Sequence, residues 1–407
     1  MSSAPENEDK FCEKEERNVE TKALNKTFMQ CMAAFLRGEP IASLSLPSPA
    51  WAKLYGLAKR QSLSGALFTV TEHLEMPEAA RARLRRDGFL SIAMAEEQHL
   101  ACRDIAKALS DKCIPHVFFK GAVLRRYYRQ PAMRSMGDID MAVRESDRLR
   151  ADAVMAELGF ACTEKTAEVW VYERRRVMVE IHTVVRRFDV RRQETAIYDT
   201  LWQDARRQDG ETYVLSDEAE ILHVIHHLAA HFSAGGCGVR QVMDVAVLYD
   251  RFAADEALWS AVMKELERQH LAAFTKRLLY LCDVWGLACV DQAHEEEVDT
   301  ETEERMLLRL LGGGTFGKDE RMRLSEQRRE ARGGQRRWRR WFPTVESMKR
   351  RFAYVQKHPW LLPVSYVHRF WQGATKNRRI HEKRRQYASL NEAELETEIA
   401  LFDAMGL

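Results

Sequence analysis

Two aspartates separated by one residue, Asp138 and Asp140, are the strongest candidates for chemistry in this sequence. They stand at the start of an apolar run, residues 139–143, which predicts a β-strand. Successive side chains of a strand point to opposite faces, so Asp138 and Asp140 are expected to point the same way. Two carboxylates on one side of a strand end can share hard cations through oxygen ligands. The spacing therefore predicts a divalent-metal site.

An acid-x-acid pair also fits a solvated turn, so the residues around it matter. The apolar, β-prone segment 114–119 comes before it and predicts a buried strand. Lys120 and Gly121 end that segment, and Arg134 and Ser135 stand just before the aspartates. This order of elements is typical of sites that bind phosphate and metal: a strand, a glycine break, a short helical segment and a second strand.

A third carboxylate, Glu180, lies on another predicted strand, residues 177–185. With residues 169–172 this strand is expected to form a hairpin around three consecutive arginines. Alternation places Glu180 and His182 on one face and Val179 on the other. An acid on an otherwise apolar strand is costly to bury unless it meets a cation or water. The alternative is a solvent-facing position on an edge strand.

The flanking segments predict helices on both sides of an α/β core, which gives an α+β fold. Residues 1–26 are charged and polar and are expected to be poorly ordered. Apolar spacing predicts a helical region over residues 27–112. The core, a small mixed sheet, covers 113–215, and helices return over 216–320, where Asp217 and Glu220 resemble a capping box. A basic, aromatic-rich helical tail follows over 321–407.

Histidines recur at helical spacing in one of the later helices, at positions 223, 227 and 231. They could seat a metal ion, but contacts between helices are the commoner use of such residues. His231 precedes a glycine-rich turn that leads to Arg240 and Asp244. Those two residues are candidates either for closing a pocket around phosphate or for a salt bridge between helices.

Composition sets limits on location and partners. The 407 residues carry a net charge of +2, which argues for no particular partner, and nucleic acid is not favoured. The eight cysteines contain no CxxC pair, which is typical of reduced thiols in a cytoplasmic protein. No segment is apolar enough for a secretory signal or a membrane span. The aromatic, arginine-rich segment around Trp338 and Trp341 predicts either an appended helix or an anion-binding surface.

Taken together, these residues resemble a family. Lys120-Gly121, Tyr128, Arg134 and the strand with Asp138 and Asp140 are similar to the LKG…Y…R…DIDLLV signature of a largely uncharacterised bacterial nucleotidyltransferase family. That family belongs to the polymerase-beta-type superfamily. Further similarities, at 180–182, 231–244, 314–317, 342–343 and 358–363, extend the resemblance over residues 28–385. The superfamily usually has Gly-Ser where this chain has Lys120-Gly121.

The resemblance implies an enzyme that moves an NMP group from an NTP to a hydroxyl acceptor and releases pyrophosphate. Asp138, Asp140 and Glu180 would bind two Mg²⁺ ions. The residues expected to bind phosphate or substrate around them are Lys120, Gly121, Arg134, Ser135, His182, His231, Arg240 and Asp244. The NTP and the acceptor, whether a small molecule, a protein or RNA, stay open.

Two other functions compete with this one. A metal-dependent phosphohydrolase would use the helix from His223 to His231 as its metal centre. A non-catalytic protein of the same fold would bind nucleotide without turnover. The presence of all three carboxylates argues against the second alternative.

Overall fold

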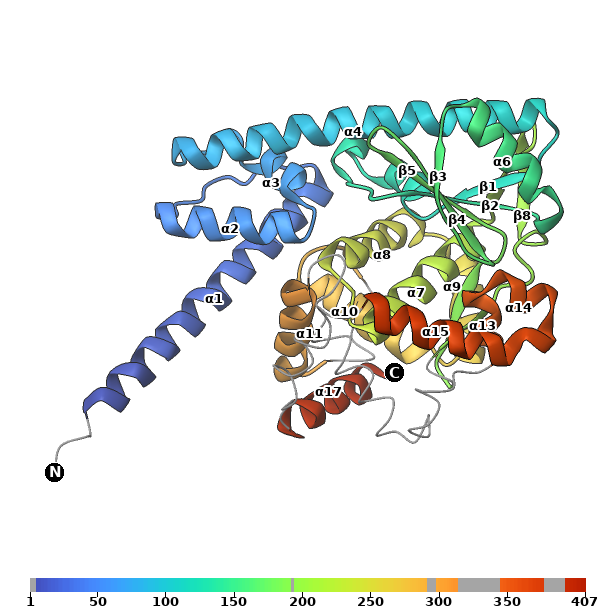
Figure 1. Cartoon of the computed structure of the whole chain (residues 1–407). Coiled ribbons are helices and arrows are strands. Elements are labelled where there is room, and N and C mark those ends of the chain that lie inside the picture. Colours follow the sequence, from blue (N-terminus) through green and yellow to red (C-terminus); the bar gives the residue numbers. More distant parts are fainter. Residues whose placement is uncertain (1–4, 192–193, 291–297, 314–344, 377–391) are drawn as a thin grey trace.

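The computed structural model describes residues 5–191, 194–290, 298–313, 345–376 and 392–407. Residues 314–317, 338, 341 and 342–343, which the sequence analysis singled out, lie outside these ranges. The fold is α+β, as predicted, with helices on either side of a seven-stranded mixed sheet. Figure 1 shows the long helix α4 running from the N-terminal helices across to the sheet.

The N-terminal region consists of helices, as the apolar spacing predicts. They are α1 (Pro5–Arg37), α2 (Ser48–Arg60), α3 (Ser64–Thr71) and α4 (Glu78–Asp111). Helix α1 begins at Pro5, so most of the segment 1–26, which was expected to be poorly ordered, is helical instead. The glutamates and lysines that suggested disorder also have high helix propensity, and this accounts for the difference.

The sheet has the order β3-β4-β5-β2-β1-β9-β8. Its strands are β1 (His116–Phe119), β2 (Ile139–Val143), β3 (Ala161–Lys165), β4 (Val169–Arg174), β5 (Val177–His182), β8 (Ala205–Asp209) and β9 (Thr212–Leu215). Strand β2 runs parallel to β5 and β1 parallel to β9, whereas the other pairs are antiparallel. Because β5 lies between β4 and β2, the edge-strand interpretation of Glu180 is wrong.

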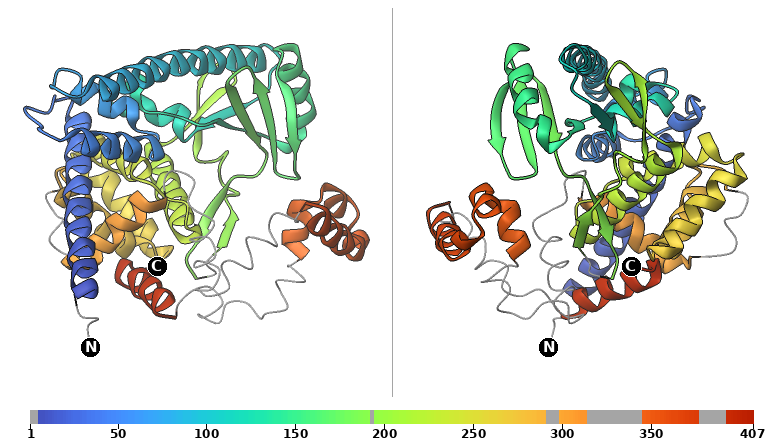
Figure 2. Two further views of the ribbon diagram at one scale, coloured as in Figure 1. Left: turned by 60° about the vertical axis from the view of Figure 1, so that its left-hand side comes forward. Right: turned by 90° about the vertical axis from the view of Figure 1, so that its right-hand side faces the viewer.

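The two faces of the sheet have different neighbours. Val177, Val179 and Ile181 of β5 are buried in an apolar cluster that also contains residues of α4 and of α6 (Arg148–Glu157). Figure 2 shows α4 lying along this side of the sheet. Glu180 and His182 alternate with these apolar side chains and therefore point to the other face, toward the C-terminal helices.

The C-terminal helices begin with α7 (Asp217–Ala234). Its N-cap is Ser216, whose hydroxyl accepts a hydrogen bond from the Ala219 amide, so the cap lies one residue before the predicted Asp217. Ala219 has no side-chain acceptor to return this bond, so the capping box predicted at Asp217 and Glu220 is replaced by a single cap. Gly235 ends α7 with φ at 87°, a left-handed conformation that favours glycine. The helices that follow are α8 (Val239–Phe252), α9 (Glu256–Arg268), α10 (Ala272–Val284), α11 (Thr300–Gly313) and α17 (Glu392–Met405).

One apolar core joins the two helical regions. Phe28 of α1 and Trp51 of α2 belong to the same buried cluster as Phe232 of α7 and Phe274 of α10. The short helices α13 (Val345–Arg351), α14 (Ala353–Lys357) and α15 (Leu362–Lys376) form a separate group around Phe352 (Figure 2). A β-hairpin of β6 (Arg186–Asp189) and β7 (Glu194–Ile197) packs against α7.

The cysteines whose side chains are described are free thiols. Among the described residues, no helix combines the length and the apolar character that a membrane span requires.

Candidate active site

Asp140 and Glu180 face each other across two neighbouring strands. They are register partners in the parallel pairing of β2 with β5, so both carboxylates project from the same face of the sheet. His182, two residues further along β5, places its Nε2 3.0 Å from Asp140 Oδ1 and 3.4 Å from Glu180 Oε2. One ligand atom from each of these three side chains lies within 4.8 Å of the others. This separation allows all three to contact one cation.

Lys120 brings a positive charge to the same point. Its Nζ lies 2.6 Å from Asp140 Oδ1, where the end of β1 adjoins β2. The backbone of Lys120 has φ at 52°, which is uncommon for a residue with a side chain. Such strain persists only where the surroundings enforce it, and it is frequent at functional sites.

The pKa values of this pair follow from its contacts. Burial by itself would raise the pKa of Asp140, but Lys120 and His182 outweigh it and hold the pKa below its ordinary value. Burial would lower the pKa of Lys120, and Asp140 reverses this effect, so the pKa is raised. Asp140 and Lys120 are therefore both charged at neutral pH.

Asp138 completes the group of three acids but stands slightly apart from the other two. It precedes β2, is half-buried, and lines the same cavity, although it does not belong to the group of three close ligand atoms. Burial raises its pKa to about 6, and the charges of Asp140 and Glu180 add to the effect. A hard divalent cation bound between these carboxylates would remove the repulsion between them. Their oxygen atoms are also the ligands that such cations prefer, so the residues present fit Mg²⁺.

The cavity in front of these residues has a volume of about 260 Å³. Nine of the predicted site residues line it, namely Lys120, Gly121, Arg134, Asp138, Asp140, Glu180, His231, Arg240 and Asp244. Ser135 and His182 are the two predicted residues that do not line it. His227 of α7 is a wall residue that was not predicted, although its spacing of four residues from His223 and His231 placed it on their face of the helix.

Arg134 is bound to a carboxylate. Its Nη2 lies 2.6 Å and its Nε 3.1 Å from the two oxygens of Asp244, and the Tyr128 hydroxyl donates to Asp244 Oδ1 at 2.8 Å. Arg134 and Asp244 are 5% and 4% exposed. The salt bridge predicted between Arg240 and Asp244 is therefore replaced by one from Arg134. The hydrogen bond from the Tyr128 hydroxyl to Asp244 was not predicted, because only the fold brings these two residues together.

Arg240, in contrast, lines the cavity and donates to a carbonyl oxygen. Its Nη1 donates to the Ser135 carbonyl oxygen at 2.9 Å, while its buried Nε has no hydrogen-bond partner among the described residues. Burial, and then the nearby charge of Arg134, lower its pKa to about 10, so it remains a cation at neutral pH. The Ser135 hydroxyl donates to the Ser62 carbonyl, so Ser135 contacts Arg240 mainly through its backbone.

The histidine helix does not provide a metal centre of its own. In the parts of the chain that the structure describes, the group of Asp140, Glu180 and His182 is the single one with three metal-ligating side chains close together. His227 and His231 pack edge to face, with ring centroids 4.3 Å apart. The pKa of His231 is lowered by burial and then by Lys120, which leaves the ring neutral.

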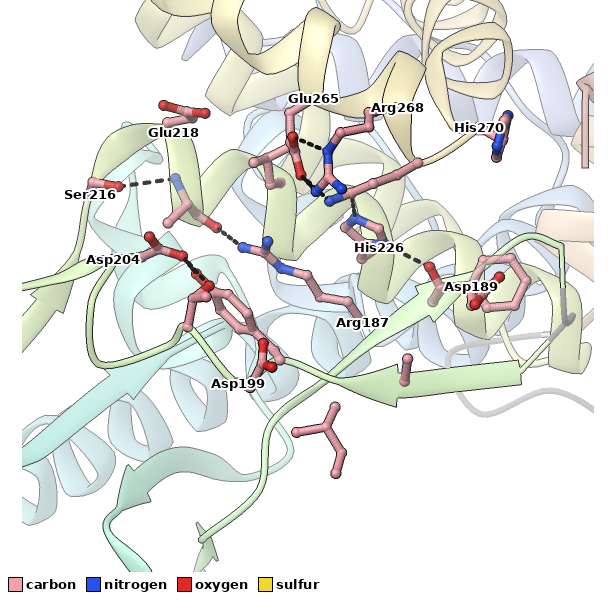
Figure 3. A pocket seen from close by; sticks show the side chains of 18 of the residues that line it. Arg187, Asp189, Asp199, Asp204, Ser216, Glu218, His226, Glu265, Arg268 and His270 are labelled. Carbon is pink, nitrogen blue, oxygen red and sulfur yellow. Dashed lines mark hydrogen bonds and ion pairs between the residues drawn. The ribbon is translucent and has the colours of Figure 1, made fainter. Parts of the chain in front are cut away.

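A larger cavity, of about 580 Å³, lies between the β6–β7 hairpin, α7 and α9 (Figure 3). None of the predicted site residues lines it. Two of its carboxylates are occupied by other protein groups: Glu265 binds Arg268, and Asp204 accepts from the Tyr198 hydroxyl at 2.5 Å. The smaller cavity beside Asp140 is thus the better candidate for catalysis.

A family model described as "uncharacterised nucleotidyltransferase" matches residues 47–286, more than half of the chain. The chain belongs to this nucleotidyltransferase family. The match spans every strand of the sheet and the acidic residues described above.

Two solved structures show similarity to part of the chain. One is the solution structure of the antibiotic-resistance factor ANT(2'')-Ia, with 15% identity, a TM-score of 0.32, and coverage of 42% of this chain and 95% of that one. The other is the crystal structure of ANT(2'')-Ia in complex with adenylyl-2''-tobramycin, with 16% identity, a TM-score of 0.32, and coverage of 42% and 98%. No curated protein matches the sequence.

Proposed function

We propose that this protein is a Mg²⁺-dependent enzyme that transfers an NMP group from an NTP to a hydroxyl acceptor and releases pyrophosphate. The observation that carries the proposal is the convergence of Asp140 and Glu180 beside Lys120 in a cavity that the guanidinium group of Arg240 also lines. Membership of the nucleotidyltransferase family supports the reaction class.

The acidic residues would hold the metal. Asp140 and Glu180 are within reach of one ion, and Asp138, which lines the same cavity, would help to hold the second ion expected from the resemblance. When bound, Mg²⁺ neutralises triphosphate charge, stabilises the leaving pyrophosphate and lowers the pKa of the attacking hydroxyl. His182 contacts both Asp140 and Glu180, and this contact orients the two carboxylates.

The cationic residues would bind the triphosphate. Lys120 and Arg240 present fixed positive charge to the cavity, which stabilises charge on phosphate oxygens better than mobile water does. Arg134 is already bound to Asp244, so we do not assign it to phosphate binding. We assign it a positioning role instead: it holds the part of the cavity wall that also contains Arg240. Gly121, directly after Lys120, leaves room for the Arg134 side chain.

The direct test is the double substitution Asp138→Asn with Asp140→Asn. Incubation with each α-³²P-labelled NTP, Mg²⁺ and a cell lysate should show label transfer and pyrophosphate release for the wild type. The double variant should lose at least about 100-fold in rate, because metal binding supplies several kcal/mol of stabilisation in the transition state. Glu173→Gln, an exposed acid on β4, is the matched control and should keep the wild-type rate.

Equal rates in the double variant and the control would show that the proposed mechanism is wrong. A wild type that binds NTP but releases no pyrophosphate with any acceptor would identify the non-catalytic alternative. The phosphohydrolase alternative has no structural support, because the histidines of α7 form no three-ligand group within the described residues. The cytoplasmic location remains a prediction.

A further inference from the structure

A second cavity, of about 400 Å³, adjoins the first. The two cavities share Lys120, His227 and His231 as wall residues, and His182 lines the second one. The imidazole that contacts Asp140 and Glu180 therefore forms part of its wall. If the NTP occupies the first cavity, a molecule in the second would meet its phosphates beside Lys120.

Imidazole rings dominate the wall of this second cavity. Four come from α7, at positions 223, 226, 227 and 231, and the fifth is His182 of β5. His223 is 3% exposed, yet neither of its ring nitrogens has a hydrogen-bond partner among the described residues. Its ring packs edge to face on Phe119, with centroids 5.3 Å apart. Buried polar atoms are nearly always hydrogen-bonded. Two unpaired nitrogens on one side chain therefore indicate that a bound ligand supplies their hydrogen-bond partners.

The histidines of α7 that face this cavity are uncharged. Burial, and then the charge of Lys120, lower the pKa values of His223 and His227 well below the ordinary value. A neutral imidazole offers one donor and one acceptor, and a hydroxyl group can satisfy either. Hydroxyl groups are therefore the natural partners of this wall.

Charged ligands find no free counter-charge among the described residues that line this cavity. Glu168 is the one carboxylate among its lining residues, and both of its oxygens bind Arg186, at 2.7 and 2.9 Å. Lys120, the other cation, is bound to Asp140. An ammonium group would thus meet no unpaired carboxylate there, and burying an unpaired charge is strongly unfavourable.

We infer that the second cavity is the acceptor subsite and that it takes a small, uncharged molecule rich in hydroxyl groups, such as a sugar or a polyol. This inference rests on the proposed nucleotidyl transfer. A volume of about 400 Å³ suits a small molecule and not a folded nucleic acid. An acceptor hydroxyl oxygen forms a bond to the α-phosphorus, the bond from that phosphorus to the β-bridging oxygen breaks, pyrophosphate leaves, and the hydroxyl proton passes to water.

The first experiment compares acceptor classes. The protein is incubated with Mg²⁺, each α-³²P-labelled NTP, and either glucose, trehalose and myo-inositol, or tobramycin, or bulk tRNA, or a protein extract freed of small molecules. Label on the neutral polyols supports the inference. Label on tobramycin, tRNA or protein but on no polyol would overturn it while leaving the proposed function intact. Absence of pyrophosphate release under every condition would overturn both.

The second experiment removes the unpaired nitrogens. His223→Phe should raise the KM for the polyol about tenfold or more, with the KM for NTP unchanged, because the acceptor loses its hydrogen bonds. The melting temperature should stay the same or rise, because no protein group loses a partner. His116→Phe is the contrasting variant: His116 is equally buried but bonded through both nitrogens, to Ile114 and Thr212.

His116→Phe should lower the melting temperature and leave the acceptor KM unchanged. A purely structural role for His223 predicts the reverse of the expected result, with a lowered melting temperature and an unchanged acceptor KM in His223→Phe. That outcome would contradict the inference.

Discussion

Lys120 Nζ and Asp140 Oδ1 lie 2.6 Å apart, at the junction of β1 with β2. The two side chains are 21% and 4% exposed, so little water separates the ammonium group from the carboxylate. One of the three acids of the site is therefore neutralised within the protein, and the other two face the cavity without a lysine or arginine bound to them in the described structure. In the proposed reaction, Lys120 would supply by charge what the superfamily's Gly-Ser step, as the resemblance implies, supplies by hydrogen bonding.

Lys120→Met should reduce kcat about 100-fold or more, since one fixed charge that stabilises the transferring phosphate is lost. Pyrophosphate release under saturating NTP and Mg²⁺ measures this effect. Lys165→Met is the control, because Lys165 forms its ion pair with Asp152 on the surface of the sheet, away from the cavity. A Lys120→Met variant with the kcat of the control would refute the role of this charge.

Gly121→Ala should destabilise the protein by roughly 1–3 kcal/mol, as overpacking does in a tight site. A Cβ atom at this position would lie 2.5 Å from Arg134 Nη1 and 2.7 Å from Met136 Sδ. Arg134 has little freedom to move, because Asp244 holds it. The same change at Gly56 of α2 should stabilise by about 0.5–1 kcal/mol, because the nearest atom is 3.6 Å away and alanine favours a helix. Urea unfolding measures the change in the free energy of unfolding for both variants. A change of the same sign in both would contradict the packing argument.

Part of the site could be predicted because its signals are local. An apolar run located β2, and the alternation of side chains along β5 placed Glu180 and His182 on one face. The pairing of Asp140 with Glu180 is not local, since β5 is added beside β2 after two intervening strands. Only the family resemblance brought these two residues together in advance.

Other features gave no usable signal. Strands β3 and β8 were not predicted, because they form the two edges of the sheet and carry mostly exposed polar residues without alternation. The sequence suggested that Arg240 and Asp244 either close a pocket around phosphate or form a salt bridge between helices. Arg134, 110 residues earlier in the chain, takes Asp244 instead, and no local pattern encodes that contact.

Asp244→Asn and Arg134→Met should each destabilise the protein by about 3–5 kcal/mol, because each leaves one buried charge without its partner. Tyr128→Phe should have a smaller effect, of about 1 kcal/mol, since it removes one hydrogen bond. Urea unfolding of the two single variants and of the double variant Arg134→Met with Asp244→Leu measures the coupling. The double variant should lose much less than the sum of the singles. Additive losses would show that the pair does not stabilise the fold as a unit.

The stability of the protein should fall as the pH decreases from about 6.5 to 4, in part because of His226. This residue is 2% exposed and bonds through Nδ1 to the Phe188 carbonyl and through Nε2 to Gln269. Burial, and then the charge of Arg187, lower its pKa from 6.5 to about 4, and Glu265 opposes this only in part. Between these two values the unfolded chain binds more protons than the folded one, so the contribution is complete above pH 6.5 and is lost toward pH 4. Each pH unit corresponds to about 1.4 kcal/mol, which gives roughly 3 kcal/mol in total.

Urea unfolding of the wild type and of His226→Gln at pH 7 and pH 4.5 isolates this contribution, because the carboxylates and the other histidines titrate in both proteins. The wild type should lose roughly 2–3 kcal/mol more than the variant between the two pH values. His99→Gln, a change of the same kind on the exposed side of α4, should behave like the wild type. If the wild type and His226→Gln lose the same amount, then His226 is not held neutral by its surroundings.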